Sequence, residues 1–169
     1  MICKNAADVE LVLTSLIGSP FINIVIDDFN YIMQDWYMAN ALAKGWDAAK
    51  QIGFFMGKIF NAFELLDEAG KSVYVLAHGE PSLKPDGRTY LKMKTTGNMV
   101  DSYITPEGKF DVVLLGISQY DSGLKKVTKQ YLTNENEYYS SAKSAPGMFE
   151  DLLIPNDLGL VEEKINQYY

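Results

Sequence analysis

Cysteine and histidine are nearly absent from this chain. There is one cysteine, Cys3, and one histidine, His78, among 169 residues. A single cysteine cannot form an internal disulfide, which is typical of proteins from reducing compartments. One Cys and one His also cannot supply the four ligands of an ordinary zinc site. A Ser-His-Asp triad would need His78 as its base, and no Gly-x-Ser-x-Gly motif accompanies it, which argues against that chemistry.

Long apolar runs are absent as well. Segments such as Phe21–Ile26 and Val112–Ile117 are much shorter than the ~20 residues that a membrane-spanning helix needs. The first residues lack the apolar segment of a signal peptide. Hydrophobic residues make up 47% of the chain and charged residues 22%, which is close to the norm for globular proteins. The sequence therefore predicts one compact cytoplasmic domain over residues 1–169.

A surplus of positive charge is also lacking, since the formal net charge is −7. This charge argues against a protein that coats nucleic acid in general, but it allows a local basic loop. Positive side chains gather at Lys84, Arg88, Lys92 and Lys94, just before Thr95-Thr96-Gly97. If a helix starts after that segment, the backbone amides of its first turn would favour binding of an anion. The alternative is an ordinary solvated face of a strand.

The order of the expected elements indicates an α/β fold. Apolar runs rich in Ile and Val predict buried strands at Phe21–Ile26, Ser72–Ala77 and Phe110–Ile117. Helical spacing predicts helices at Phe29–Ala43, Trp46–Leu66 and Leu158–Tyr168. Pro81–Arg88 is a polar loop-like stretch with a Pro-Asp-Gly turn, and Tyr90–Lys94 alternates like a strand. Lys125–Thr133 returns as the second strand of a hairpin. We therefore expect a mostly parallel sheet with flanking helices and a C-terminal β-hairpin.

Two acidic residues follow the first buried run. Asp27 and Asp28 come directly after Asn23-Ile24-Val25-Ile26, and His78 ends the second buried run. Ligand sites of α/β folds lie at the carboxyl ends of their strands. In a nucleotidase the first carboxylate would orient magnesium and the second would polarise water, while His78 could sense a phosphate or bound DNA. The alternatives are an acidic helix cap and a half-buried, hydrogen-bonded histidine.

Two further segments were weighed as phosphate sites. Gly70-Lys71-Ser72 ends like a Walker A motif, but position 65 is Leu65 instead of glycine. The order of elements there is helix, loop and strand, the reverse of a phosphate-binding loop, so this segment is rejected. Lys143 lies between small residues and could approach a phosphate or a neighbouring subunit.

Taken in order, several segments resemble the RecA-like P-loop ATPases of tailed phages, including recombinases that anneal single-stranded DNA. The matching segments span nearly the whole chain: Ile24–Met33, Lys44–Asp47, Leu76–Glu80, Lys92–Asp101, Ala142–Phe149 and Ile154–Leu158. The resemblance implies ATP and Mg²⁺ as cofactors, with Asp27 as the magnesium ligand, Asp28 as the candidate base and His78 at the end of the sensor strand. It places Lys143 near a nucleotide at the subunit boundary, and Lys84, Arg88, Lys92 and Lys94 in a DNA-contacting loop. It also implies a phage-encoded protein of the bacterial host cytoplasm that binds single-stranded DNA and forms homo-oligomers.

The family's Walker A motif is missing from these 169 residues. Without that loop there is no amide cradle and no lysine for the phosphates, so we expect this chain alone to be inactive as an ATPase. Either the chain is a fragment or split-gene product whose missing loop another chain can supply, or the protein is a non-catalytic binding module of the same fold.

The resemblance also makes a structural prediction. Phe21–Ile26 and Ser72–Ala77 should be adjacent parallel strands, with Asp27 and His78 at the same edge. On the other side of Ser72–Ala77, either Phe110–Ile117 closes up or the edge stays open for a partner strand.

Overall fold

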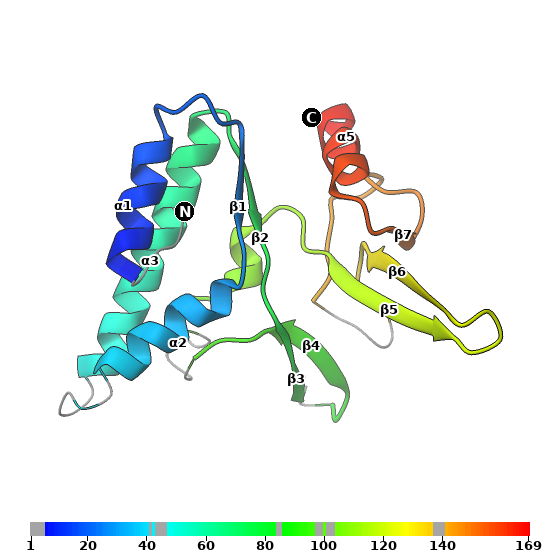
Figure 1. Ribbon diagram of the computed structural model, residues 1–169, viewed down its shortest axis with the longest axis horizontal. Helices are drawn as coiled ribbons and strands as arrows, with labels where there is room; N and C mark the ends of the chain where they lie inside the picture. Colours follow the sequence, from blue (N-terminus) through cyan, green and yellow to red (C-terminus); the bar gives the residue numbers. More distant parts are fainter. Residues whose placement is uncertain are drawn as a thin grey trace. The chain divides into compact units, whose positions relative to one another are not determined.

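The computed structural model describes residues 6–40, 42, 47–83, 86–96, 100, 104–136 and 141–169. The chain divides into two compact units (Figure 1). The first contains the described parts of residues 1–79 and 93–109, and the second those of residues 80–92 and 110–169. None of the described helices is both long enough and apolar enough to cross a membrane.

Three helices and a pair of strands build most of the first unit. Its elements are α1 (Ala6–Leu16), β1 (Asn23–Ile26), α2 (Phe29–Asn40), α3 (Asp47–Glu68), β2 (Ser72–Val75) and the 3₁₀ turn η1 (Pro106–Lys109). The apolar side chains of α3 recur at helical spacing, and this periodicity gives the helix one buried stripe. The buried residues of that stripe are Ile52, Met56, Ile59, Phe60, Phe63 and Leu66. The expected helices around residues 29–43 and 46–66 are thus confirmed, with ends shifted by a few residues.

The strands β1 and β2 form the expected parallel pair. Asn23 lies opposite Ser72 and Ile26 opposite Val75. The connection between them contains α2 and α3, as parallel strands require a long crossover. The prediction that these two runs are parallel neighbours is therefore confirmed.

Aromatic packing joins the start of α2 to α3. The Phe29 ring is fully buried and meets the Phe60 ring edge to face, with centroids 5.8 Å apart. Phe63 completes the cluster at 5.9 Å from Phe29 and 5.6 Å from Phe60. Each buried aromatic of this kind contributes about 1.5–3 kcal/mol by leaving water. This cluster fixes the point at which the chain leaves β1.

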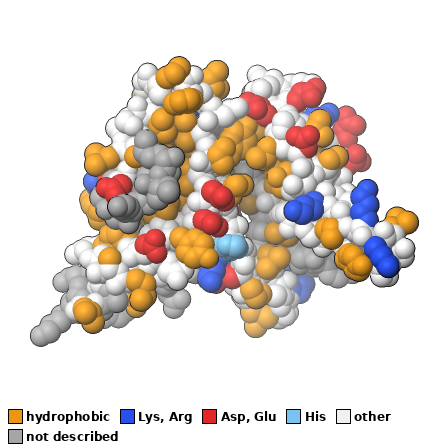
Figure 2. Space-filling model, viewed as in Figure 1, with side chains coloured by type: hydrophobic (Ala, Val, Ile, Leu, Met, Phe, Trp, Pro, Cys, Tyr) orange, Lys and Arg blue, Asp and Glu red, His pale blue; other side chains and the backbone are white. Residues whose placement is uncertain are grey.

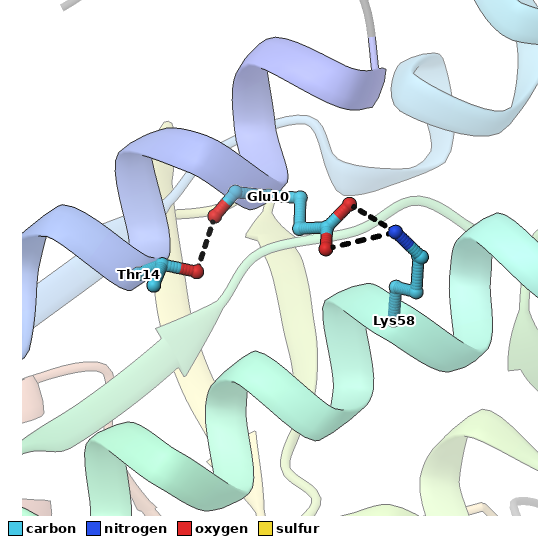
Figure 3. Close-up of polar contacts among 3 residues, drawn as sticks. All are labelled: Glu10, Thr14 and Lys58. Carbon is cyan, nitrogen blue, oxygen red and sulfur yellow. Dashed lines mark hydrogen bonds and ion pairs between the residues drawn. The ribbon is translucent and has the colours of Figure 1, made fainter.

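Charged side chains link α1 to α3 at the surface of the first unit. Lys58 Nζ donates to both carboxylate oxygens of Glu10, at 3.1 and 3.2 Å (Figure 3). On the same helix face Thr14 donates its hydroxyl to the Glu10 carbonyl. Exposed ion pairs contribute only about 0.2–1 kcal/mol, so burial holds these helices together more than this contact does.

Short strands dominate the second unit. They are β3 (Gly79–Leu83), β4 (Thr89–Met93), β5 (Leu115–Asp121), β6 (Lys126–Leu132) and β7 (Leu153–Pro155), followed by helix α5 (Leu158–Tyr168). The first residue of β3 and the last of β4 belong to the first unit. A small core forms where Met148, Phe149 and Val161 are buried, with half-buried side chains such as Ile154 and Ile165 around them. The expected strand at Tyr90–Lys94, the hairpin and the last helix are confirmed.

The expectation of a mostly parallel sheet is wrong. The strands form three small sheets, β1-β2, β3-β4 and β5-β6-β7, and only the first is parallel. The physical reason is the length of the connections. Among the described connections between strands, only that of residues 27–71 contains helices long enough to return the chain to the start of a parallel strand. In contrast, β5 and β6 are joined by a four-residue turn that permits only antiparallel pairing.

Two local expectations also need correction. Most of Phe110–Ile117 is not a strand and does not pair with β2. Val113 makes an isolated antiparallel bridge with Lys143, and β5 begins only at Leu115. The predicted polar loop before Tyr90 contains β3, because its pairing with β4 outweighs the weak strand propensity of Glu80-Pro81-Ser82.

Candidate functional site

Asp27, Asp28 and His78 lie together at the carboxyl end of the parallel pair. Asp28 Oδ1 is 3.3 Å from His78 Nε2, and both side chains are more than half exposed. The sequence places them at strand ends, and the parallel register of β1 and β2 brings those ends to one edge. The prediction that Asp27 and His78 end at the same edge is thus confirmed.

The backbone turns sharply at Asp28. Its φ is 55°, in the left-handed region that non-glycine residues seldom adopt. The Asp28 amide donates to Asp27 Oδ1 at 3.0 Å, and the Asp28 carbonyl accepts the Tyr31 amide at 2.9 Å. Aspartate tolerates this conformation because its short carboxylate can hydrogen-bond locally. The turn points β1 directly into α2.

Two hydrogen bonds hold the backbone of His78 in place. Its amide donates to Oδ1 of Asn30, a buried side chain, at 3.1 Å. Its carbonyl accepts the Lys94 amide at 2.7 Å. The Tyr31 ring packs edge-on against the imidazole, with centroids 6.1 Å apart. The imidazole in Figure 2, shown in pale blue, therefore reaches solvent from a fixed main chain.

A magnesium ion at the corner formed by Asp27, Asp28 and His78 would need most of its ligands from elsewhere. Among the described residues no group of three or more His, Cys, Asp or Glu side chains could hold a metal ion by itself. Magnesium in nucleotide sites commonly takes one or two carboxylates and fills its shell with water and phosphate oxygens. The Asp27 carboxylate is exposed at the strand end and already accepts the Asp28 amide with one oxygen, which leaves its other oxygen for a metal.

The predicted DNA-contacting segment is partly neutralised by acids next to it. Arg88 pairs with Asp86 at 2.8 Å, and Lys92 pairs with Glu80 at 3.4 Å. The Asp86 carboxylate raises the pKa of the Arg88 guanidinium above its usual value, chiefly through a hydrogen bond. Lys94 is exposed. Lys84 lies outside the described residues, so the role of this segment stays a prediction.

Lys143 belongs to the second unit, in which its backbone exchanges two 2.8 Å hydrogen bonds with Val113. The next residue, Ser144, is fixed by the side chain of Asn134, which accepts its amide and donates to its hydroxyl. The lysine side chain is half-buried. Its assignment to a nucleotide therefore remains an expectation from the resemblance.

Three residues with clear structural roles were missed in the sequence. Asn30 and Tyr31 support His78, and Lys71 donates to the carbonyls of the loop before β1. Asn30 could have been noticed as a polar residue between Phe29 and Met33 on a core-facing helix. Lys71 had no signal beyond its rejected similarity to a Walker A lysine.

Comparison with protein-family models, curated proteins and solved structures found no match to this chain.

Proposed function

We propose that this chain contributes a magnesium-nucleotide corner to an ATP-dependent phage recombination protein that acts on single-stranded DNA. The observation that carries the proposal is the common edge of β1 and β2, where Asp27, Asp28 and His78 meet. In α/β proteins, ligands bind at the carboxyl ends of parallel strands. The phosphate-binding loop would come from a different chain, because these 169 residues contain no Walker A motif.

Each residue of the corner has a distinct part in this proposal. Asp27 would hold Mg²⁺, whose charge neutralises the phosphates of ATP when it is bound. Asp28 would orient a water molecule or accept a proton from it. Its contact with His78 keeps the carboxylate directed across the strand ends. Asn30 and Tyr31 are positioning residues: Asn30 accepts the His78 amide, and Tyr31 packs against the imidazole and donates its amide to the Asp28 carbonyl.

A paramagnetic ion tests this proposal without relying on turnover. The chain contains one histidine, so the imidazole of His78 gives a unique Cε1–H resonance. Adding Mn²⁺ with ATP should broaden that resonance, and Asp27→Asn should remove most of the broadening. The matched control is Asp35→Asn, which removes an exposed acid of α2 and should leave the broadening unchanged.

Equal broadening in the wild-type chain and in Asp27→Asn would contradict the assignment of the metal. Both arms use the full chain at one pH.

A second candidate function is a non-catalytic interaction module, and the surface of β1 favours it. Phe21, Ile22 and Val25 are exposed apolar side chains at or just before β1. Among the described residues no further strand pairs with either edge of the β1-β2 sheet. Apolar strands with open edges tend to pair with other chains.

The association state of the chain in solution tests this second candidate function. Sedimentation of the wild-type chain over a range of concentrations should show self-association, and Phe21→Ser/Val25→Ser should weaken it. Leu124→Ser, which removes an exposed leucine elsewhere, is the control. A monomer at all concentrations would count against this surface as a contact between copies.

A further inference from the structure

The hairpin of β5 and β6 presents an exposed, well-defined tip. Asp121 lies opposite Lys126, and residues 121–129 are all exposed. Asp121 Oδ1 closes the turn by accepting the amides of Gly123 at 2.8 Å and Leu124 at 2.9 Å. Lys125 completes the turn with a φ of 49°. These hydrogen bonds therefore fix the shape of the tip, and its side chains remain exposed to solvent.

This hairpin is a basic element in an acidic chain. Its residues Leu115–Leu132 include three lysines, Lys125, Lys126 and Lys129, against one aspartate. The aspartate is already engaged in the turn. No ion pair within the described parts of the chain involves the three lysines. Figure 2, drawn from the same side as Figure 1, shows lysine side chains gathered over the hairpin.

An aromatic ring shares one face of the hairpin with a lysine. The register pairs Ser118 with Lys129 and Tyr120 with Val127. Side chains two residues apart on a strand point to the same face, so these four form one surface. Tyr120 is 65% exposed although it is a large aromatic residue. Leu124, in the turn, is exposed as well.

We infer that the β5-β6 hairpin binds single-stranded nucleic acid, with a base stacked on Tyr120 and a phosphate at Lys129 on the same face. Lys125 in the turn and Lys126 on the opposite face would hold further phosphates as the strand passes over the tip. Unpaired cations on an acidic protein are complementary to a polyanion. An exposed ring among lysines adds a surface on which an unstacked base can lie, as in proteins that bind single strands. A duplex keeps its bases stacked, and an acidic polypeptide has no base to offer the ring, so both fit this face less well.

The inference deepens the proposed function, since it names the surface that would contact single-stranded DNA. It is separable from the magnesium corner, because the hairpin lies in the second unit and the corner in the first. It also differs from the predicted segment, whose Arg88 and Lys92 are paired with acids.

Fluorescence anisotropy of labelled oligothymidylate with the full chain tests the hairpin. Lys126→Ala/Lys129→Ala should weaken binding and reduce the slope of log affinity against log salt by about 1.4, the value for two phosphates of a single strand. The control Lys50→Ala/Lys164→Ala removes two exposed lysines from helices and should leave both quantities near the wild-type values. Circular dichroism should show that all variants are folded.

Substitutions of Tyr120 test the stacked base. Tyr120→Ala should weaken binding roughly 5- to 150-fold, and Tyr120→Phe should retain most of the affinity because the ring remains. A matching oligoribonucleotide shows whether DNA or RNA is preferred, and either preference agrees with the inference. Preferred binding of duplex DNA, or polyglutamate competing equally well with Tyr120→Ala unchanged, would overturn it.

Two results distinguish this inference from the proposed function. If Lys92→Ala/Lys94→Ala abolishes binding and the hairpin variants do not, the hairpin inference fails while the proposed DNA partner stands. If the hairpin variants lose binding but Mn²⁺ with ATP never broadens the His78 resonance, the hairpin inference stands and the nucleotide corner fails. Equal losses in the hairpin and control variants would also refute a specific role for the hairpin.

Discussion

Asp28 is the residue at which the chain turns from β1 into α2, with a φ of 55°. An L-residue pays about 1–2 kcal/mol for this conformation, whereas glycine adopts it freely. Both Asp28→Gly and Asp28→Ala remove the contact with His78, so comparing them isolates the backbone. We expect the glycine variant to have a free energy of unfolding about 1 kcal/mol higher than the alanine variant, measured by urea denaturation.

The same pair of substitutions at Gln34, an exposed position within α2, is the control for Asp28. There alanine should be the more stable variant by roughly 1 kcal/mol, because glycine is unfavourable inside a helix. The same order of stability at both positions would contradict a left-handed backbone at Asp28.

Lys71 is a buried cation, only 8% exposed, and its ammonium group donates to two backbone carbonyls. The acceptors are Ser19 O at 2.8 Å and Phe21 O at 2.7 Å, in the loop that leads into β1. We expect Lys71→Met to lower the free energy of unfolding by about 1.5–3 kcal/mol, because it leaves these carbonyls without their charged donor. Lys50→Met, at an exposed position of α3, should change it by less than about 0.5 kcal/mol. Similar losses in the two urea titrations would show that the Lys71 contacts do not stabilise the fold.

At the scale of elements, α5 illustrates how a local signal defines a helix. Its N-cap is Asp157, whose carboxylate accepts the Gly159 amide at 2.8 Å. We expect Asp157→Ala to reduce helix stability by about 1 kcal/mol, and Asp157→Asn to preserve most of it. Hydrogen exchange of the α5 amides measures this directly. Unchanged protection in Asp157→Ala would mean that packing of Val161 alone maintains the helix.

At the scale of the whole molecule, the proposed function predicts no ATPase activity for this chain alone, because its 169 residues contain no Walker A motif. Each lost charge-assisted hydrogen bond to phosphate removes about 1.5–3 kcal/mol of binding, and several are lost together. We therefore expect the purified chain alone to release negligible phosphate from ATP. A phosphate-release assay with Mg²⁺ checks this, with Asp27→Ala as the reference. Magnesium-dependent turnover that Asp27→Ala abolishes would refute the prediction.

The sequence by itself determined the elements whose signals are local. The spacing of Ile52, Met56, Ile59 and Phe63 predicted a helix, because the period of the α-helix places them on one stripe. The run before Asp27 and the run before His78 predicted two strands, but the expectation that both are buried is wrong, since β1 is mostly exposed and β2 half-buried. A long crossover between them leaves parallel pairing as the natural arrangement, so the meeting of Asp27, Asp28 and His78 was also predictable.

The tertiary structure alone decided which strands share a sheet and which charges stay unpaired. An apolar run such as Phe110–Ile117 can pair equally well with a parallel or an antiparallel strand. Which strand it pairs with therefore depends on long-range hydrogen bonds such as those of Val113 with Lys143. Likewise, Lys92 and Lys129 look alike in the sequence, but folding places Glu80 beside Lys92 and Tyr120 on the face of Lys129. Charge pairing depends on distances between residues far apart in the chain, and those distances exist only once the chain has folded.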